Sequence, residues 1–160
     1  MKQRAYTIRI AEYDHLEELS GDRADLVKKA IEAASRAYAP YSGYLVGASL
    51  LLENGKIICG NNQENAASPS GLCAERVALF YAGARYPDTA VLSIAIAAIR
   101  NGNVQEEPVT PCGGCRQVLI EKERTGKKPM EVILYGSSRI QVLRSASDLM
   151  PLPFVFTPGT

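Results

Sequence analysis

The sequence predicts an α/β protein built as a layered sandwich, and three observations support this prediction. Segments with the spacing of amphipathic helices alternate, along 160 residues, with short segments rich in Val, Ile and Leu. Residues 91–99 are almost wholly apolar, which is typical of a central strand covered on both faces. The chain shows no internal repeat and no interdomain linker, so we expect one domain over residues 1–160, with residues 1–20 as an N-terminal arm.

The first forty residues predict an arm followed by a helix. Residues 6–10 alternate weakly between polar and apolar side chains, and an edge strand and an ordered arm fit this pattern equally well. Residues 22–38 predict a helix that ends before Pro40. The apolar side chains of this helix recur at helical spacing: Leu26, Val27, Ala30, Ile31, Ala34 and Tyr38.

A β-hairpin is predicted next. Strand-like segments at residues 45–52 and 56–60 flank Asn54-Gly55, a strong signal for a two-residue turn. Pairing about that turn would bring residue 45 near residue 64. We therefore expect three side chains to gather at the open end of the hairpin, close to the start of the next helix: Tyr44, Asn62 and Glu64.

The second half continues the alternation of helices and strands. Residues 73–84 predict a helix with Cys73, Val77, Tyr81 and Ala84 on one stripe. Residues 112–122 predict a short helix with Cys115, Val118 and Leu119 facing inward. The remaining patterns predict loops at 66–71 and 101–108, strands at 131–135 and 139–143, and a helical turn at 145–150.

Composition and charge narrow the class of protein. The formal net charge is +1, which does not favour a nucleic-acid or membrane surface as partner. No apolar run reaches the ~18 residues of a membrane-spanning helix, and the start of the chain lacks the long apolar segment of a signal peptide. We therefore expect a cytoplasmic protein with no nucleic-acid and no membrane partner.

Three of the four cysteines form a candidate metal site. Cysteines in a reducing compartment are more often metal ligands than disulfide partners. Cys73 precedes one predicted helix, and Cys112 and Cys115 lie in a Pro-Cys-x-x-Cys frame at the start of another. Three thiolates suffice for a catalytic zinc, whose fourth position stays open for water. The only histidine, His15, lies in a charged N-terminal segment, so a mainly histidine-built zinc site is excluded.

Charged residues beside these cysteines suggest catalysis. Glu75 follows Cys73 by two residues and could move the protons of an activated water, although a glutamate in the first turn also stabilises a helix through its dipole. Three thiolates leave a zinc site with a net negative charge. Arg76 could offset that charge by donating to the sulfurs, and Arg116 could act in the same way. For each arginine the alternative is a solvated surface side chain.

A structural zinc site is the competing hypothesis. Such a site would use Cys59 as its fourth ligand. Cys59 follows two isoleucines in a predicted strand and has no Cys-x-x-Cys partner. We therefore expect Cys59 to be a small buried apolar side chain.

Taken together, the motifs resemble those of cytidine deaminases of the homotetrameric, three-cysteine type. The resemblance runs from about residue 37 to residue 154. The motifs that carry it are Ala39-Pro40-Tyr41-Ser42, Val46-Gly47-Ala48, Gly60-Asn61-Asn62-Gln63-Glu64-Asn65-Ala66, Cys73-Ala74-Glu75-Arg76, Pro111-Cys112-Gly113-Gly114-Cys115-Arg116-Gln117 and Leu149-Met150-Pro151.

The resemblance implies a fold and an activity. The fold would be a three-layer α-β-α sandwich around a five-stranded mixed sheet. The activity would be hydrolytic deamination of cytidine and deoxycytidine to uridine and deoxyuridine in pyrimidine salvage, with one zinc ion per chain. The implied assembly is a homotetramer with active sites near subunit interfaces.

The same resemblance implies roles for residues around the reacting base. Glu75 would protonate N3 of the base and carry protons to the departing ammonia. The backbone N–H of Ala74 would bind the O2 carbonyl of the base. The carbonyl of Thr110 would lie near the leaving amine.

Further positions match the nucleoside-binding residues of the family. Asn62 and Glu64 match a pair that holds the ribose 3′-hydroxyl. Tyr44 stands where a phenylalanine usually contacts the nucleoside. Phe154 matches a tail aromatic that reaches the base pocket of a neighbouring subunit.

Some positions depart from the family pattern. Ser68 stands where an aromatic side chain is common, and Ser70 where an apolar one is usual. We expect Tyr44 or the tail aromatics to fill the space beside Ser68. The alternatives are a deaminase for a blasticidin-type cytosine nucleoside, which Asn62 and Glu64 disfavour, and a non-catalytic structural zinc protein.

Overall fold

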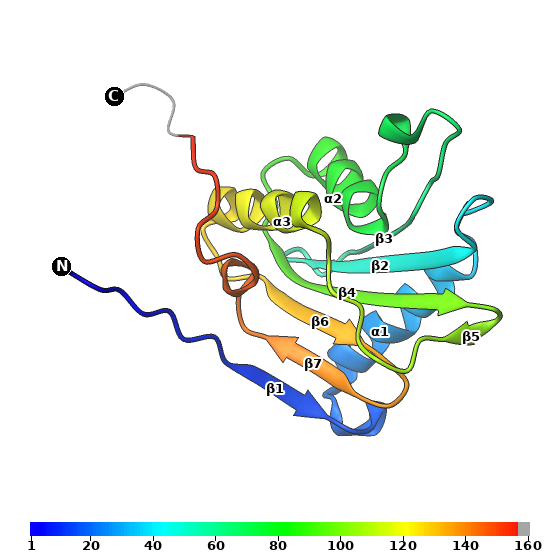
Figure 1. Ribbon diagram of the computed structural model, residues 1–160, viewed down its shortest axis with the longest axis horizontal. Helices are drawn as coiled ribbons and strands as arrows, with labels where there is room; N and C mark the ends of the chain where they lie inside the picture. The colour runs from blue at the N-terminus through cyan, green and yellow to red at the C-terminus, as the bar shows by residue number, and fades with distance from the viewer. Residues whose placement is uncertain (157–160) are drawn as a thin grey trace.

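A mixed β-sheet forms the middle of the computed structural model, which describes residues 1–156 (Figure 1). Its strands are β1 (Ile10–Tyr13), β2 (Tyr44–Leu52), β3 (Ile57–Asn61), β4 (Val91–Arg100), β5 (Asn103–Val104), β6 (Glu131–Tyr135) and β7 (Ile140–Leu143). The order is β1-β7-β6-β4-β2-β3, and β5 pairs with β4. The pair β4–β6 is parallel, whereas the other pairs are antiparallel.

The sheet holds the five strands expected from the sequence, and two short strands extend it. Strand β1 adds to the edge of β7, with Ile10 opposite Leu143. Strand β5 returns onto β4 through a turn in which Asn101 and Gly102 both adopt positive φ angles. Residues 6–10 fit an edge strand and an ordered arm equally well, and of these only Ile10 belongs to β1. Its partner Leu143 is the last residue of β7.

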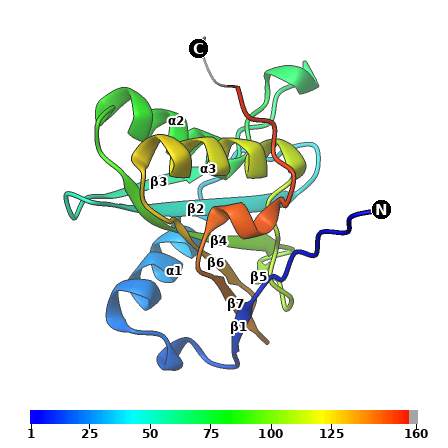
Figure 2. The same cartoon turned by 90° about the vertical axis from the view of Figure 1, so that its left-hand side faces the viewer.

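Helices cover both faces of the sheet, which confirms the three-layer α-β-α sandwich (Figure 2). Helix α1 (Gly21–Ala34) packs on one face, and α2 (Ala74–Arg85) and α3 (Gly113–Gly126) lie side by side on the other. Helix α1 ends earlier than the expected residue 38. The reason is that Tyr38 leaves the helix to donate its N–H to the Asn62 carbonyl at 3.0 Å.

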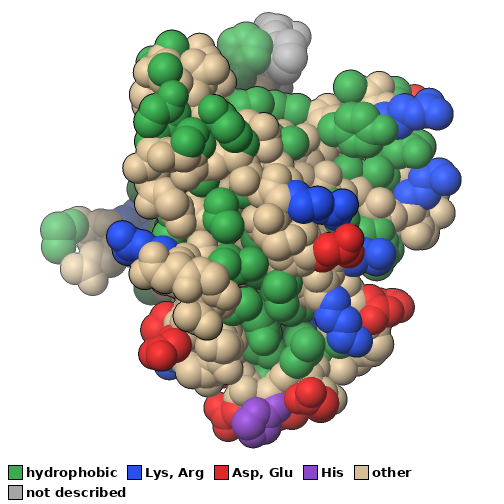
Figure 3. Space-filling view, turned by 90° about the vertical axis from the view of Figure 1, so that its right-hand side faces the viewer, with side chains coloured by type: hydrophobic (Ala, Val, Ile, Leu, Met, Phe, Trp, Pro, Cys, Tyr) green, Lys and Arg blue, Asp and Glu red, His purple; other side chains and the backbone are tan. Residues whose placement is uncertain are grey.

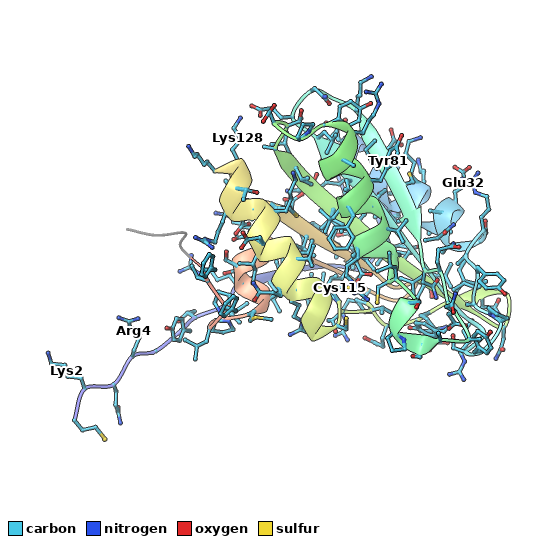
Figure 4. All side chains as sticks on the ribbon, turned by 90° about the horizontal axis from the view of Figure 1, so that it is seen from above. Lys2, Arg4, Glu32, Tyr81, Cys115 and Lys128 are labelled. Atoms are coloured by element: carbon cyan, nitrogen blue, oxygen red, sulfur yellow. The ribbon has the colours of Figure 1, made fainter. Side chains whose placement is uncertain are left out.

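Helix α2 turns a different face to the sheet from the predicted stripe. Tyr81 of that stripe is 56% exposed, and it lies on the outer side of the helix (Figure 4). The buried face carries smaller side chains: Ala74, Ala78, Leu79 and Ala82. Gly60 of β3 explains this close packing, since a Cβ there would lie 2.6 Å from the Ala78 nitrogen. The α2 helix therefore rests almost directly on the backbone of β3.

The hairpin turn differs from the predicted two-residue turn. Leu52 donates its N–H to the Lys56 carbonyl, so three residues separate the paired positions. A two-residue type I′ turn needs a positive φ at both Asn54 and Gly55. In the structure only Gly55 has one, at +77°. The register therefore shifts by one residue, and Gly47 lies opposite Asn61.

Three short 3₁₀ turns complete the fold of residues 1–156: η1 (Leu16–Glu18), η2 (Ser68–Ser70) and η3 (Ala146–Leu149). The last lies within the predicted turn at 145–150, and Ser145 accepts a hydrogen bond from the Ser147 N–H at its start. Among the helices of the described residues, none is long and apolar enough to span a bilayer.

Candidate metal centre

Both cysteine motifs lie at helix starts. Cys73 is the residue before α2, and Cys112 is the residue before α3. Each has an extended backbone and accepts the first helical hydrogen bond, from Val77 and Arg116 respectively. The sequence signals for these two helices therefore also fix where the cysteines sit.

The three expected ligand sulfurs come together because α2 and α3 start at the same end of the sheet. The Sγ atoms of Cys73, Cys112 and Cys115 all lie within 4.8 Å of one another. Within residues 1–156 no other group of three such donors occurs. Cys115 is buried inside the first turn of α3 (Figure 4), whereas Cys112 is exposed.

This donor set fits zinc. At a Zn–S distance of about 2.3 Å, two sulfurs on a tetrahedral zinc lie about 3.8 Å apart, which small side-chain shifts can reach from the observed spacing. Three protein ligands leave one position for water, as in catalytic rather than structural zinc sites. All four cysteines are free thiols, and Cys59 is not in the cluster.

Cys59 corrects one expectation. It is exposed on β3 instead of buried, because alternate side chains of this strand point away from α2. The charged side chains that interact with the Cys59 thiol are Lys29 and Glu32 of α1 and Arg36 just after that helix. Helix α1 covers the face of the sheet opposite to α2. A four-cysteine structural site that includes Cys59 is therefore excluded by the fold.

The surroundings of the cysteines favour a thiolate at Cys73. Hydrogen bonding with Cys115, and then with Arg76, lowers the pKa of the Cys73 thiol to about 5. The same contact with Cys73, together with burial, raises the pKa of Cys115. Zinc ligands must lose their protons, and these contacts favour that loss at Cys73.

The two arginines hold different parts of the site. Arg76 Nη2 lies 3.8 Å from Cys73 Sγ, as expected for a partner of the sulfur. Its Nε is buried and has no hydrogen-bond partner in the described part of the chain. Arg116 instead donates to the carbonyls of Pro111 at 2.8 Å and Leu149 at 3.1 Å, so it holds the backbone before Cys112 rather than a sulfur.

Glu75 is a buried carboxyl beside the cysteines. It is 4% exposed in the first turn of α2. Burial raises its pKa, and the negative charge of Cys73 raises it further. A carboxyl whose charged form is disfavoured holds a proton more readily than a solvent-exposed one, which suits a proton carrier. Ala74, the first residue of α2, is fully buried beside it.

A groove of about 430 Å³ opens beside Cys73 and Arg76. Its other lining residues are Tyr41, Asn62, Gln63, Glu64, Asn65, Ala66, Ser68, Gly71 and Leu72. Asn62 accepts from the Val46 N–H at 2.7 Å and donates to the Tyr44 carbonyl at 2.9 Å. The hairpin thus brings Asn62 and Glu64 to the metal centre, as expected from the sequence.

Other expected site residues lie outside this groove. Tyr44 is half-buried at the start of β2, where burial raises its pKa, and Thr110 is exposed two residues before Cys112. Phe154 lines a separate apolar groove of about 540 Å³ between α2 and α3. Gln117 fixes it there, because its side chain bonds both the N–H and the carbonyl of Phe154. Within one chain, therefore, neither Tyr44 nor Phe154 fills the space beside Ser68.

Sequence reasoning gave no role to Ser42. Its hydroxyl bonds both Glu64 and the Tyr44 N–H. The signal that could have found it is a serine two residues before an expected binding residue, directly after Pro40-Tyr41, where short polar side chains commonly bond nearby backbone groups. His15, by contrast, lies among acidic side chains at the edge of the face shown in Figure 3 and takes no part in the cluster.

Comparison with known proteins identifies the family of this site. Residues 21–128 match the family model described as the cytidine and deoxycytidylate deaminase zinc-binding region. The chain is 46% identical over 100 residues to a cytidine deaminase of Halalkalibacterium halodurans, covering 62% of this chain and 71% of that protein. A cytidine deaminase of Mycobacterium tuberculosis is 38% identical over 93 residues, covering 58% of this chain and 65% of that protein.

Solved structures agree with the sequence relatives. The crystal structure of a cytidine deaminase from Burkholderia pseudomallei superposes with a TM-score of 0.71 at 38% identity, covering 85% of this chain and 100% of that one. A cytidine deaminase structure from Mycobacterium tuberculosis gives a TM-score of 0.67 at 31% identity, covering 86% and 100%.

Proposed function

The chain belongs to the cytidine and deoxycytidylate deaminase zinc-binding family, and on that premise we propose that it hydrolyses cytidine and deoxycytidine to uridine and deoxyuridine with release of ammonia. The observation that carries this proposal is the meeting of three cysteine sulfurs within 4.8 Å at two helix starts, beside the buried Glu75. The enzyme is a zinc-dependent hydrolase with one zinc per chain. Zinc held by the three cysteines supplies a Lewis acid that activates water.

Glu75 is the proposed proton carrier. Its burial raises its pKa, so the carboxyl can give a proton to N3 of the base and pass further protons to the amino group that departs. Its backbone is fixed in the first turn of a helix that packs against β3. Arg76 supports the ligand set by donating to Cys73 and offsetting the negative charge of the thiolates.

Backbone groups at the two helix starts are proposed to orient the base. Ala74 is the first residue of α2, where N–H groups have no partner within the helix, and its N–H suits the O2 carbonyl of the base. The Thr110 carbonyl, just before the Cys112 loop, suits the leaving amine. Arg116 holds this loop through the Pro111 carbonyl.

The ribose is proposed to bind in the groove beside Cys73. Asn62 and Glu64 would hold its 3′-hydroxyl, and Tyr44 would contact the nucleoside near the start of β2. Support comes from Asn62, whose side chain bridges two backbone groups of β2 and is therefore held in one orientation. An ordered amide and carboxylate in one groove suit a neutral, hydroxyl-rich ligand.

The proposed assembly is a homotetramer with active sites near the subunit interfaces. Phe154 is 71% exposed and Phe156 67% exposed, and both line the apolar groove over α2 and α3. Apolar side chains exposed together favour contact with another chain. Phe154 would then reach the base pocket of a neighbour. We also propose a cytoplasmic location, because the site needs three reduced thiols. A role in pyrimidine salvage is proposed from the substrates.

The decisive experiment is the loss of cytidine absorbance with the purified protein. Activity should disappear with a chelator and return on addition of zinc, with one zinc found per chain by elemental analysis. Cys59→Ser is the matched control, since that cysteine lies outside the cluster. Zinc binding without turnover of cytidine or deoxycytidine would reject the proposed substrates.

A further inference from the structure

The loop before β2 packs against the segment that follows β3, and main-chain hydrogen bonds hold the two together. The Tyr38 N–H donates to the Asn62 carbonyl at 3.0 Å, and the Glu64 N–H donates to the Tyr38 carbonyl at 2.8 Å. Within the loop, the Gly43 N–H donates to the Ala39 carbonyl at 3.0 Å. The backbone of Glu64 is therefore fixed against this loop independently of any side chain.

Ser42 links the side chain of Glu64 to the start of β2. Its hydroxyl donates to Glu64 Oε1 at 2.5 Å and accepts from the Tyr44 N–H at 3.0 Å. The second carboxylate oxygen, Oε2, accepts from the N–H groups of Tyr41 at 2.9 Å and Ser42 at 3.3 Å. Ser42 is the only side chain that donates to Glu64 among the described residues.

We propose that Ser42 is a positioning residue for the nucleoside, whose hydroxyl orients the Glu64 carboxylate toward the ribose and ties it to the backbone of Tyr44. This inference rests on the proposed function, in which Glu64 and Tyr44 both contact the substrate. One hydroxyl thereby sets the spacing between the group that holds the sugar and the aromatic residue beside the nucleoside.

The place of Glu64 in the groove makes such an anchor useful. Glu64 is half-buried and lines the groove, where a carboxylate without an anchor samples several rotamers and must be ordered when a ligand binds. The hydrogen bond from Ser42, and then that from the Tyr41 N–H, lowers the pKa of Glu64. The carboxylate is thus held ionised and oriented before the ribose arrives.

The test compares two substrates and three variants. Ser42→Ala removes the anchor, Ser42→Thr keeps the hydroxyl, and Ser35→Ala is a matched control in which another exposed serine loses a hydrogen bond, here to the Glu32 carbonyl. The substrates are cytidine and its 3′-deoxy analogue, which lacks the hydroxyl assigned to Glu64. For Ser42→Ala we expect KM for cytidine to rise about tenfold with kcat nearly unchanged, since a charged hydrogen bond becomes less ordered.

The expected pattern is specific to positioning. With the 3′-deoxy analogue as substrate, Ser42→Ala should have the same KM as the wild type, and Ser42→Thr and Ser35→Ala should behave as wild type on both substrates. Equal losses on both substrates, or no loss on either, would overturn the proposal.

A carboxyl-carbon NMR titration adds a readout without turnover. The pKa of Glu64 should rise in Ser42→Ala, and an unchanged pKa would also overturn the proposal. A wild-type protein that deaminates neither nucleoside would instead reject the proposed function, while the titration still decides the role of Ser42.

Discussion

Replacing Glu75 by Gln should abolish most of the activity while leaving the protein folded and zinc-loaded. The amide has the shape of the carboxyl but cannot carry protons. Burial already disfavours the charge on Glu75, so a neutral amide should cost little stability. General acid–base catalysis contributes about 10²–10⁴-fold, which corresponds to about 2.7–5.5 kcal/mol of activation free energy. We expect kcat to fall by at least this factor.

The second buried glutamate, Glu123, gives a matched control with the opposite outcome. Its carboxylate accepts hydrogen bonds from the N–H groups of Met130 at 2.7 Å and Ala146 at 2.9 Å, and from the Ser145 hydroxyl at 2.9 Å. Glutamine would turn an NH₂ group toward some of these donors. We expect Glu123→Gln to lose about 2–4 kcal/mol of unfolding free energy, or about 4–16 °C in Tm, with kcat unchanged below the transition.

The two variants are compared by three measurements on the purified proteins: the initial rate of cytidine deamination, the zinc content by elemental analysis, and thermal unfolding by circular dichroism. If Glu75→Gln kept more than about a tenth of the wild-type rate, the assignment of Glu75 as the proton carrier would be wrong. Loss of zinc from that variant would also refute the argument, because the carboxyl would then be acting on the metal site rather than on protons.

Three further outcomes are expected. Serine in place of any one of the three ligand cysteines should remove zinc, whereas Cys59→Ser should keep it; elemental analysis decides, and zinc loss in the Cys59 variant would revive a four-cysteine site. Truncation after Pro151 removes the tail aromatics and should weaken both the oligomer and the activity, measured by light scattering and turnover; an active truncated tetramer would contradict a shared pocket. Ser68→Tyr adds a ring to an open part of the groove, so cytidine kinetics should stay unchanged while a cytidine extended at its ribose 5′ end is turned over more slowly; a raised KM for cytidine would mean that the space is already filled.

The strands that sequence patterns located best are those whose pairing is dictated by burial. Residues 91–99 are apolar on both faces, and they form the central strand β4. The pattern of residues 6–10 fits an edge strand and an ordered arm equally well, and only pairing with β7 places the strand at Ile10–Tyr13. The hairpin was expected in the right place but with its register shifted by one residue, because Asn54-Gly55 is compatible with both a two-residue and a three-residue loop.

The sequence by itself determined the zinc ligands and the proton carrier as candidates, because their signals are local. A cysteine before a helix, a glutamate in its first turn and a Cys-x-x-Cys spacing are set by a few neighbouring residues. Helix periodicity and helix-start signals are likewise local, so they also placed α2 and α3.

Only the tertiary structure decided how these local pieces meet. The convergence of Cys73 with Cys112 depends on two helices that pack on the same end of one sheet, about forty residues apart in sequence. The partners of Arg116 and the exposure of Cys59 depend equally on which elements become neighbours. Such contacts arise from packing between segments distant in the chain, and periodicity within one segment carries no information about the face that a distant segment will cover.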